Sequence, residues 1–362
     1  MANTLTLPST VHLVGAIGLD TVPETFEAVG RILGNRVKRV PDGEPGGRRM
    51  WIAWQFPLLR ANPFLKAVAP PAGGSAINFP FMALADGIGA EQLRFCELGY
   101  AREAYASYAD FKAAQRAGKL PADVRFQVTL PTPYAVVSAF CLRSDQAAIE
   151  PAYERAMLRE VATICATIPH DELTIQWDVC PEMIVWDGRL PRVKNTFEDP
   201  QGEILSRMRR ISAAIPPAVE LGFHLCYGDV DGQHFIEPLD AGKLVELANA
   251  LARSIPRPIA YIHMPVPIAR TDEAFFKPLA ALTLAPGTEL YLGCVHAADG
   301  VEGTLRRIEA ARKFVAHFGI ATECGMGRCK TPEVVGQLLA IHAAATADGA
   351  PTSGGARHAR AP

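Results

Sequence analysis

The sequence predicts an α/β protein built as a single (β/α)8 TIM barrel with a long helical insertion after strand 2. Eight short apolar runs recur along its 362 residues, and each is followed by a stretch with helical patterning. Eight strands that alternate with helices match the number that a closed parallel barrel requires. An open doubly wound sheet is the alternative, but the first run leads into Gly15-Ala16-Ile17-Gly18, which lacks the glycine spacing of a dinucleotide-binding loop.

The predicted strands are apolar over most of their length, as is typical of parallel strands that are buried on both faces. In chain order they are Val11–Ile17, Val37–Pro41, Phe126–Leu130, Leu173–Trp177, Glu220–Cys226, Ile259–His263, Glu289–His296 and Gly319–Glu323. Between several of these runs, apolar residues recur at three- and four-residue spacing, which predicts amphipathic helices. The predicted helices are Ser144–Thr167, Asp240–Arg253, Gly300–Phe318 and Thr331–Ala345.

The connection between the second and third strands is too long for an ordinary barrel loop. It covers residues 44–125, and we expect it to fold locally and to cover one face of the barrel. Arg48–Arg60 and Arg102–Gly118 have helical patterning within it. We therefore expect one barrel with its insertion over residues 1–347, followed by a disordered Gly/Ala/Arg-rich tail over residues 348–362.

Composition and net charge argue against some classes of binding partner. The net charge is -2 and the basic residues are scattered, so we expect neither nucleic acid nor a membrane surface as a partner. The chain contains no long apolar run and no signal-peptide pattern, which favours the cytoplasm. In that reducing compartment, the eight cysteines are expected to be thiols or metal ligands and not disulfides. The oligomeric state stays open.

Two strand ends carry residue types that bind zinc. His224 and Cys226 lie two apart on one predicted strand, so their side chains share a face. Cys324 follows the last strand, in Glu323-Cys324-Gly325, and is expected to point into the same opening. Two thiolates and an imidazole suit Zn²⁺ and leave room for a substrate. A buried His-x-Cys pair in the core is the alternative interpretation.

Other polar side chains end neighbouring strands. His263 is either a fourth zinc ligand or a hydrogen-bonding residue of the wall, and Cys294 and Cys329 are weaker ligand candidates. Glu44, Asp178 and His296 follow the second, fourth and seventh strands. Because the carboxyl ends of barrel strands meet at one mouth, we expect these residues to form one catalytic site. For Asp178, capping of the following helix is the alternative role.

These motifs resemble the C-terminal catalytic barrel of cobalamin-independent methionine synthase, in the superfamily shared with uroporphyrinogen decarboxylase. The resemblance covers about Val11 to Ala345. Phe223-His224-Leu225-Cys226-Tyr227 resembles the family's His-Met-Cys-Tyr zinc motif, and Glu323-Cys324-Gly325-Met326 resembles its Asp-Cys-Gly-Leu. Three further segments are similar to its Gln-Ile-Asp, His-Gly-Glu and Tyr-Asp-Ile-His motifs: Ile175–Asp178, Asp42–Glu44 and Tyr291–His296.

The resemblance implies zinc at His224, Cys226 and Cys324. It further implies that Asp178 and Glu44 hold the amino group of a thiol substrate, that Trp177 and Gly15 lie in the substrate site, and that His296 transfers a proton. The sequence departs from the family in three places. His263 stands where the family has a glutamate ligand, and Gly15-Ala16-Ile17-Gly18 replaces Gly-Ser-Phe-Pro. The resemblance also implies folate, but the tryptophan on which folate stacks falls near Ala139.

The function expected from these features is a zinc-dependent alkyl (methyl) transferase that activates a small thiol as a zinc-bound thiolate. One alternative keeps this chemistry but opens an epoxide, as in the epoxyalkane:coenzyme M transferases of the same superfamily. Another is a metal-free lyase similar to uroporphyrinogen decarboxylase, which would need Arg48, Arg49 and Arg270 at the mouth to bind acidic substrates. A non-enzymatic zinc-storing protein is the last alternative.

Overall fold

The computed structural model describes residues 7–69, 79–190, 197–229, 233–328 and 330–347. The predicted tail 348–362 and the ligand candidate Cys329 lie outside the described residues. Among the described helices, none combines the length and the apolar character needed to span a membrane.

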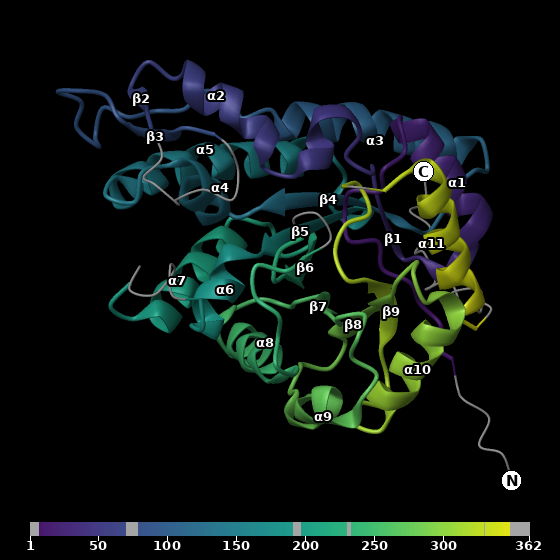
Figure 1. Ribbon diagram of the computed structural model, residues 1–362. Helices are drawn as coiled ribbons and strands as arrows, with labels where there is room; N and C mark the ends of the chain where they lie inside the picture. The colour runs from purple at the N-terminus through teal and green to yellow at the C-terminus, as the bar shows by residue number, and fades with distance from the viewer. Residues whose placement is uncertain (1–6, 70–78, 191–196, 230–232, 329, 348–362) are drawn as a thin grey trace, which may run out of the picture.

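A seven-stranded parallel sheet forms the centre of the molecule (Figure 1). Its spatial order is β1 (Arg39–Pro41), β4 (Arg125–Pro131), β5 (Leu173–Val179), β6 (Glu220–Leu225), β7 (Tyr261–Pro265), β8 (Glu289–Val295) and β9 (Gly319–Thr322). From β4 to β9, each strand lies beside the strand that follows it in the chain, as expected when helices connect parallel strands. Seven of the predicted strands are confirmed, with ends that differ by at most two residues.

The two edges of the sheet are joined through the N-terminal segment. Val11 forms parallel bridges both to Val37, which precedes β1, and to Ile320 on β9. Its N–H donates to the carbonyl of Arg36 over 2.8 Å, and the N–H of His12 donates to Ile320 over 2.9 Å. The curled sheet is thereby connected into a ring, although the eighth segment is not a regular strand.

The predicted strand Val11–Ile17 is therefore wrong beyond its first residue. The reason is competition for its backbone groups. The carbonyls of Leu13 and Val14 accept hydrogen bonds from the side chains of Gln127 (2.9 Å) and Gln176 (2.6 Å). Both glutamines are buried, on β4 and β5, so these carbonyls bond to side chains instead of continuing a ladder between two strands.

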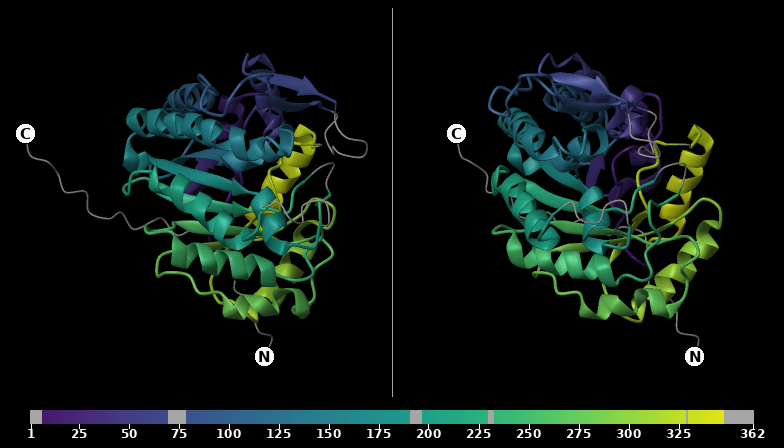
Figure 2. Two further views of the ribbon diagram at one scale, coloured as in Figure 1. Left: turned by 90° about the vertical axis from the view of Figure 1, so that its left-hand side faces the viewer. Right: turned by 60° about the vertical axis from the view of Figure 1, so that its left-hand side comes forward.

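Helices cover the outside of the sheet (Figure 2). They are α1 (Val22–Leu33), α3 (Tyr100–Arg116), α5 (Gln146–Thr167), α7 (Pro200–Ala213), α8 (Gly242–Ser254), α10 (Gly300–Arg312) and α11 (Pro332–Ala344). The last helix packs on the first, α11 on α1, so the helical layer closes at the same place as the sheet. Four of these seven, α5, α8, α10 and α11, lie where amphipathic spacing predicted them, but α10 ends at Arg312 and not at Phe318.

The stretch between β1 and β4 contains several short elements. After 3-10 turns at Gly46–Met50 and Ala53–Gln55 come α2 (Phe56–Ala61) and an antiparallel pair, β2 (Leu65–Val68) and β3 (Phe81–Leu84). The predicted helix Arg48–Arg60 is confirmed only in its second half, as α2, because Trp51 adopts a positive φ of 54° that a continuous helix cannot accommodate. The other predicted helix is confirmed as α3, which packs against α1, α5 and β4.

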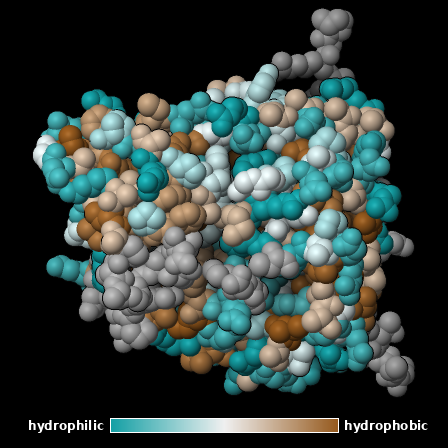
Figure 3. Space-filling view, turned by 45° about the horizontal axis from the view of Figure 1, so that its top comes forward, coloured by the Kyte–Doolittle hydropathy of each residue, from teal (hydrophilic) through white to brown (hydrophobic). Residues whose placement is uncertain are grey.

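Three short helices complete the connections at the carboxyl ends of strands. They are α4 (Pro133–Phe140) after β4, α6 (Pro181–Asp187) after β5 and α9 (Glu273–Phe276) after β7. On the face drawn in Figure 3, hydrophilic and hydrophobic residues are interspersed and do not gather into one apolar area.

Opposite the mouth, at the amino ends of the strands, buried charges are paired. The guanidinium of Arg39 lies between two carboxylates, 2.6 Å from Glu220 and 2.7 Å from Glu289. It also lies 4.7 Å from the ring centre of Tyr261. Burial opposes ionisation, but Arg39 and its basic neighbours keep the pKa of both carboxyl groups below its ordinary value. This end of the barrel is therefore a closed ion-pair network.

Candidate metal centre

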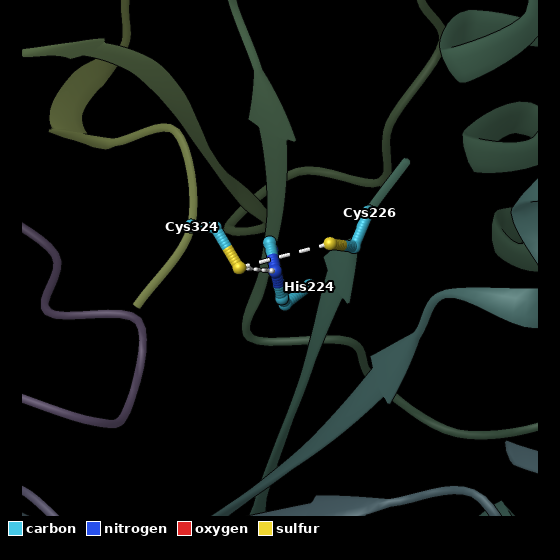
Figure 4. A group of neighbouring side chains, drawn as sticks. All are labelled: His224, Cys226 and Cys324. Atoms are coloured by element: carbon cyan, nitrogen blue, oxygen red, sulfur yellow. Dashed lines mark hydrogen bonds between the residues drawn. The ribbon is translucent and has the colours of Figure 1, made fainter. Parts of the chain in front are cut away.

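Three potential metal ligands meet at the carboxyl ends of β6 and β9. In Figure 4 the side chains of His224, Cys226 and Cys324 point toward one another from the end of β6 and from the loop after β9. The two sulfur atoms are 3.8 Å apart, and the sulfur of Cys324 is 3.7 Å from Nε2 of His224. Their ligand atoms all lie within 4.8 Å of one another, so the three residues could hold a metal ion.

The cluster has two arms: the end of β6, which carries His224 and Cys226, and the loop after β9, which carries Cys324. Local backbone contacts explain how these two arms converge. Beyond β6, the N–H of Cys226 still donates to the carbonyl of Val179 over 3.0 Å, which continues the ladder for one more residue. On the other arm, the loop after β9 passes close to β8. A Cβ at Gly293 would lie 2.7 Å from Cα of Glu323, so only glycine allows this approach.

The protonation states of the three candidate ligands are suited to a metal ion that binds by displacing the protons of the two thiols. Burial, with His263 and His12 nearby, keeps the pKa of His224 well below its ordinary value, so its imidazole is neutral. The contact with Cys180 and burial raise the pKa of Cys226, and the contact with Cys226 and burial raise that of Cys324. Both thiols are neutral at pH 7 unless a cation replaces their protons.

His263, the possible fourth ligand, lies behind His224. It is fully buried on β7, in register with His224 on β6. One ring nitrogen lies 2.7 Å from Nδ1 of His224, and the other lies 3.1 Å from the carbonyl oxygen of Thr322. Both nitrogens of His263 are thus already engaged in hydrogen bonds, and the residue is not among the three whose ligand atoms converge.

Glu44 and Asp178 form an acidic area beside the cluster. Asp178 accepts hydrogen bonds from Trp51 (3.1 Å) and Gln176 (2.9 Å). Burial and the charges of Asp178 and Asp42 raise the pKa of Glu44 well above its ordinary value. Burial raises the pKa of Asp178 in the same direction, with a contribution from Cys324. Two carboxyl groups that disfavour ionisation together are suited to receive a cationic group.

The backbone at Glu44 is strained. Glu44 has φ of 50° and Gly43 has φ of 82°, in the left-handed region. A side chain at residue 43 would lie 2.6 Å from Oγ1 of Thr25, so glycine is required there. A non-glycine residue in this conformation is typical of functional sites. Glu44 and Trp51 also line a pocket, together with residues of β4 and α3.

Two other residues, Gly15 and Trp177, are expected in the substrate site, and their surroundings differ. A Cβ added at Gly15 would lie 3.1 Å from Oε1 of Glu44, so a larger residue there would crowd the carboxyl group. Trp177 is completely buried in the hydrophobic core, with 0% of its surface exposed. In this structure it offers no surface to a substrate.

His296 lies at the end of β8, apart from the three convergent ligands. Its Nε2 lies 2.8 Å from the carbonyl oxygen of Val266, so that nitrogen carries a proton. Its Nδ1 lies 4.0 Å from Glu323, whose other carboxylate oxygen is 3.0 Å from His234. Burial lowers the pKa of His296, and Glu323 opposes this shift. His234 and Glu323 had no role in the sequence-based prediction, because neither follows a metal-binding spacing.

Arg328 is a cation that the sequence-based prediction missed. Its guanidinium lies 3.9 Å from the sulfur of Cys324 and is largely buried. Burial opposes its charge, but Cys324 and Asp229 raise its pKa. The sequence Gly-Met-Gly-Arg after Cys324 signals a loop, and nothing in its spacing shows that the arginine turns back toward the thiol.

The arginines that a lyase would need are otherwise engaged. Arg48 pairs with Asp42, and Arg49 pairs with Asp20, each over 2.7 Å. Arg270 pairs with Asp272 over 2.8 Å. Since each of these three is already paired with a carboxylate, they do not form an arginine cluster of the kind expected for a decarboxylase of acidic substrates.

Together, the fold and the site define an α/β protein with a curled parallel sheet and a candidate metal centre at its carboxyl edge. No protein-family model matches the sequence, and a search of curated proteins gives no match. Among solved structures, a B12-independent methionine synthase from Shewanella sp. W3-18-1, in complex with selenomethionine, aligns with a TM-score of 0.57 at 14% identity, over 94% of this chain and 97% of that one. A putative vitamin-B12-independent methionine synthase from Listeria monocytogenes aligns with a TM-score of 0.56 at 12% identity, over 93% and 96%. The chain therefore shares the fold of these structures, which confirms the resemblance at the level of the fold.

Proposed function

We propose that this protein is a zinc-dependent alkyltransferase that places a methyl group on the sulfur of a small thiol. The observation that carries this proposal is the convergence of one neutral imidazole and two thiols within 4.8 Å at the barrel mouth. This soft donor set fits zinc, and three protein ligands leave one position open for a substrate. The similar structures are named methionine synthases, which supports methyl transfer as the reaction class.

His224, Cys226 and Cys324 would hold the ion. When bound, zinc would supply a Lewis acid that lowers the pKa of a thiol from about 8.5, so that sulfur is nucleophilic at neutral pH. In the transfer, a bond forms between the sulfur and the alkyl carbon as the bond between that carbon and its leaving group breaks. The proton of the thiol goes to solvent, and the leaving group takes a proton from the protein.

Glu44 and Asp178 would bind a cationic group of the acceptor. Their carboxyl groups repel each other when both are charged, and burial intensifies this repulsion. An ammonium group between them would remove that cost. Arg328, on the side of Cys324, would hold an anionic group of the same molecule. The acceptor is then an aminothiol that also carries an acid.

His296 would supply the proton for the leaving group. Its Nε2 proton is held by the carbonyl of Val266, so a proton for transfer would have to be carried on Nδ1, which faces Glu323, in the charged form of the ring that burial disfavours. Glu323 stabilises the charged form of His296, and His234 fixes the second oxygen of that carboxylate. The side chain of His296 is 12% exposed, which leaves it accessible to a bound donor.

Zinc content measured on purified protein tests the metal centre directly. We expect about one zinc per chain, and a loss of about tenfold or more in Cys226→Ser because one of three ligands is removed. Cys165→Ser is the matched control, because Cys165 is also buried but lies on α5, away from the mouth. Zinc retained in Cys226→Ser, or no zinc in the wild-type protein, would contradict the proposal.

The substrate class is tested on the zinc-loaded protein by thermal shift and by mass spectrometry of S-alkyl products. Three thiols distinguish the possible acceptors: homocysteine carries an ammonium group and a carboxylate, cysteamine carries only an ammonium group, and 2-mercaptoethanesulfonate carries only an anionic group. Methyltetrahydrofolate and a simple epoxide separate the two donor classes. We expect homocysteine-like acceptors to bind most tightly. Preference for mercaptoethanesulfonate with an epoxide would favour the epoxyalkane-transferase alternative.

A further inference from the structure

Two histidines from adjacent strands lie side by side at the candidate metal centre. His224 on β6 and His263 on β7 are register partners, and their side chains are 2% and 0% exposed. Their ring centres are 4.8 Å apart, and the two Nδ1 atoms are 2.7 Å apart. At that distance one Nδ1 must carry a proton and the other must accept it.

The position of that proton follows from the third partner. Nε2 of His263 lies 3.1 Å from the carbonyl oxygen of Thr322, and a carbonyl oxygen can only accept. Nε2 of His263 therefore carries its proton. Because His263 is fully buried and its two nitrogens contact His224 and the carbonyl of Thr322, and not a carboxylate that would stabilise a charge, its ring is neutral and has no second proton. Its Nδ1 must then be the acceptor, and Nδ1 of His224 must be the donor.

This assignment leaves one nitrogen of His224 without a proton. A neutral imidazole that carries its proton on Nδ1 has a bare Nε2, and Nε2 of His224 is the atom that lies 3.7 Å from the sulfur of Cys324. The lone pair of His224 is therefore directed into the ligand cluster before any ion enters. A metal needs this tautomer, and the opposite tautomer would place an N–H there.

The same chain of hydrogen bonds reaches the other arm of the cluster. The carbonyl of Thr322 accepts from His263, while the hydroxyl of Thr322 donates to the carbonyl of Cys324 over 2.7 Å. His263 thus connects the histidine ligand on β6 to the backbone that carries the cysteine ligand after β9. It contacts both arms and leaves the open coordination position to the substrate.

We infer that His263 is a positioning residue that fixes His224 as its Nδ1–H tautomer and holds the Cys324 loop in register, and that it is not itself a ligand. The inference extends the proposed function, because it assigns how the protein prepares its metal site. It also gives a physical role to the residue that stands where the family glutamate would bind zinc. To act as a ligand through Nδ1, His263 would have to give up its hydrogen bond with His224.

The tautomer can be measured without any metal. In metal-free protein labelled with ¹⁵N-histidine, long-range ¹H–¹⁵N spectra distinguish Nδ1–H from Nε2–H rings, and His224→Asn identifies the signals of His224. We expect the Nδ1–H form for His224 in the wild type and its loss in His263→Phe. An Nε2–H ring in the wild-type protein would overturn the inference. This measurement stands even if the wild-type protein binds no zinc, in which case only the proposed function fails.

Zinc affinity gives the second readout, by competition with a chromophoric chelator. We expect His263→Phe to weaken zinc binding by about 10- to 100-fold, the usual effect of removing a residue that orients a ligand. His263→Gln should recover most of the loss, since an amide can both accept from His224 and donate to Thr322. His342→Phe is the matched control, because His342 is equally buried and bonds a carbonyl, that of Leu338, on the distant helix α11.

Cobalt substitution separates positioning from ligation. The visible spectrum of the Co²⁺ protein reports the set of ligand atoms, so it should be unchanged in His263→Gln if His263 is not a ligand. A changed spectrum in that variant, or a loss of affinity as large as in Cys226→Ser, would show that His263 binds the metal and would overturn the inference. Unchanged affinity in His263→Phe would overturn it as well.

Discussion

Charged side chains are arranged in opposite ways at the amino ends and at the carboxyl ends of the parallel strands. At the amino ends of the strands, Arg39 lies between Glu220 and Glu289, and each charge has a partner of opposite sign. At the carboxyl ends, Glu44 and Asp178 lie close together, and their pKa values are raised in a shared acidic environment. Paired charges stabilise the fold, while unsatisfied charges of like sign cost free energy. A bound cationic group would relieve that cost, which supports the proposed site at the carboxyl ends of the strands.

The largest expected effect on stability is at the closed end. Arg39→Met removes the guanidinium that Glu220 and Glu289 share. Removing one member of a buried ion pair costs about 3–5 kcal/mol, and we expect the lower end of this range because Arg125 and Lys38 still contact the two carboxylates. Chemical denaturation should show this loss, while the zinc content of the folded protein stays unchanged. Adding Glu220→Gln and Glu289→Gln to Arg39→Met should restore much of the stability. If Arg39→Met abolished zinc binding in folded protein, the separation of the two ends would be wrong.

Glu182 tests whether an unpaired buried acid implies function by itself. It is fully buried in the first turn of α6, and among the described residues it forms no ion pair. Burial raises its pKa from 4.5 to about 7, against a smaller opposing effect of Thr132. The folded protein therefore holds a proton that the unfolded chain releases above pH 4.5. The stability of the wild type should fall as the pH rises from about 4.5 to 7.

Glu182→Gln removes that pH dependence. Below pH 4.5 the variant and the wild type should be equally stable, and above pH 7 the variant should be more stable by about 3 kcal/mol, the free-energy equivalent of the shift. Urea denaturation at several pH values measures this difference. Zinc content and thiol binding should not change. A loss of thiol binding in this variant would extend the functional site into the helical layer and weaken the comparison between the two ends.

The sequence predicted the regular parts of the molecule well. Parallel strands buried on both faces leave continuous apolar runs, so seven strands could be predicted, and with them the positions of the residues at their ends. The segment after Val11 is also apolar, but buried glutamine side chains take its carbonyls, and this competition has no local signal. His224, Cys226 and Cys324 could be predicted as a group because strand alternation and barrel topology bring them together.

The partners of these residues could not be predicted in the same way. The hydrogen bond between His224 and His263 depends on the register of two strands whose residues lie 39 positions apart in the chain. Arg328 returns toward Cys324 through an irregular glycine-containing loop. Residues that orient or neutralise a ligand are defined by their distance from it in the folded structure and not by a fixed spacing in the sequence. They become visible only when the strands and loops are placed in space.

The smallest expected effect on stability is at the open end, and it should have the opposite sign from that at the closed end. Glu44→Gln replaces a half-buried acid that disfavours ionisation, so we expect a gain of about 1 kcal/mol at pH 8, a size common for changes that relieve a functional site. The gain should vanish below about pH 4, where both folded and unfolded chains hold the proton. The same variant should bind aminothiols about 10- to 100-fold more weakly, because a charge-assisted hydrogen bond is lost. Exposed Glu91→Gln is the control and should change neither quantity. A Glu44→Gln variant that is less stable and binds thiols normally would show that Glu44 supports the fold, and the acidic mouth would then have to be interpreted as structural, like the ion pairs around Arg39.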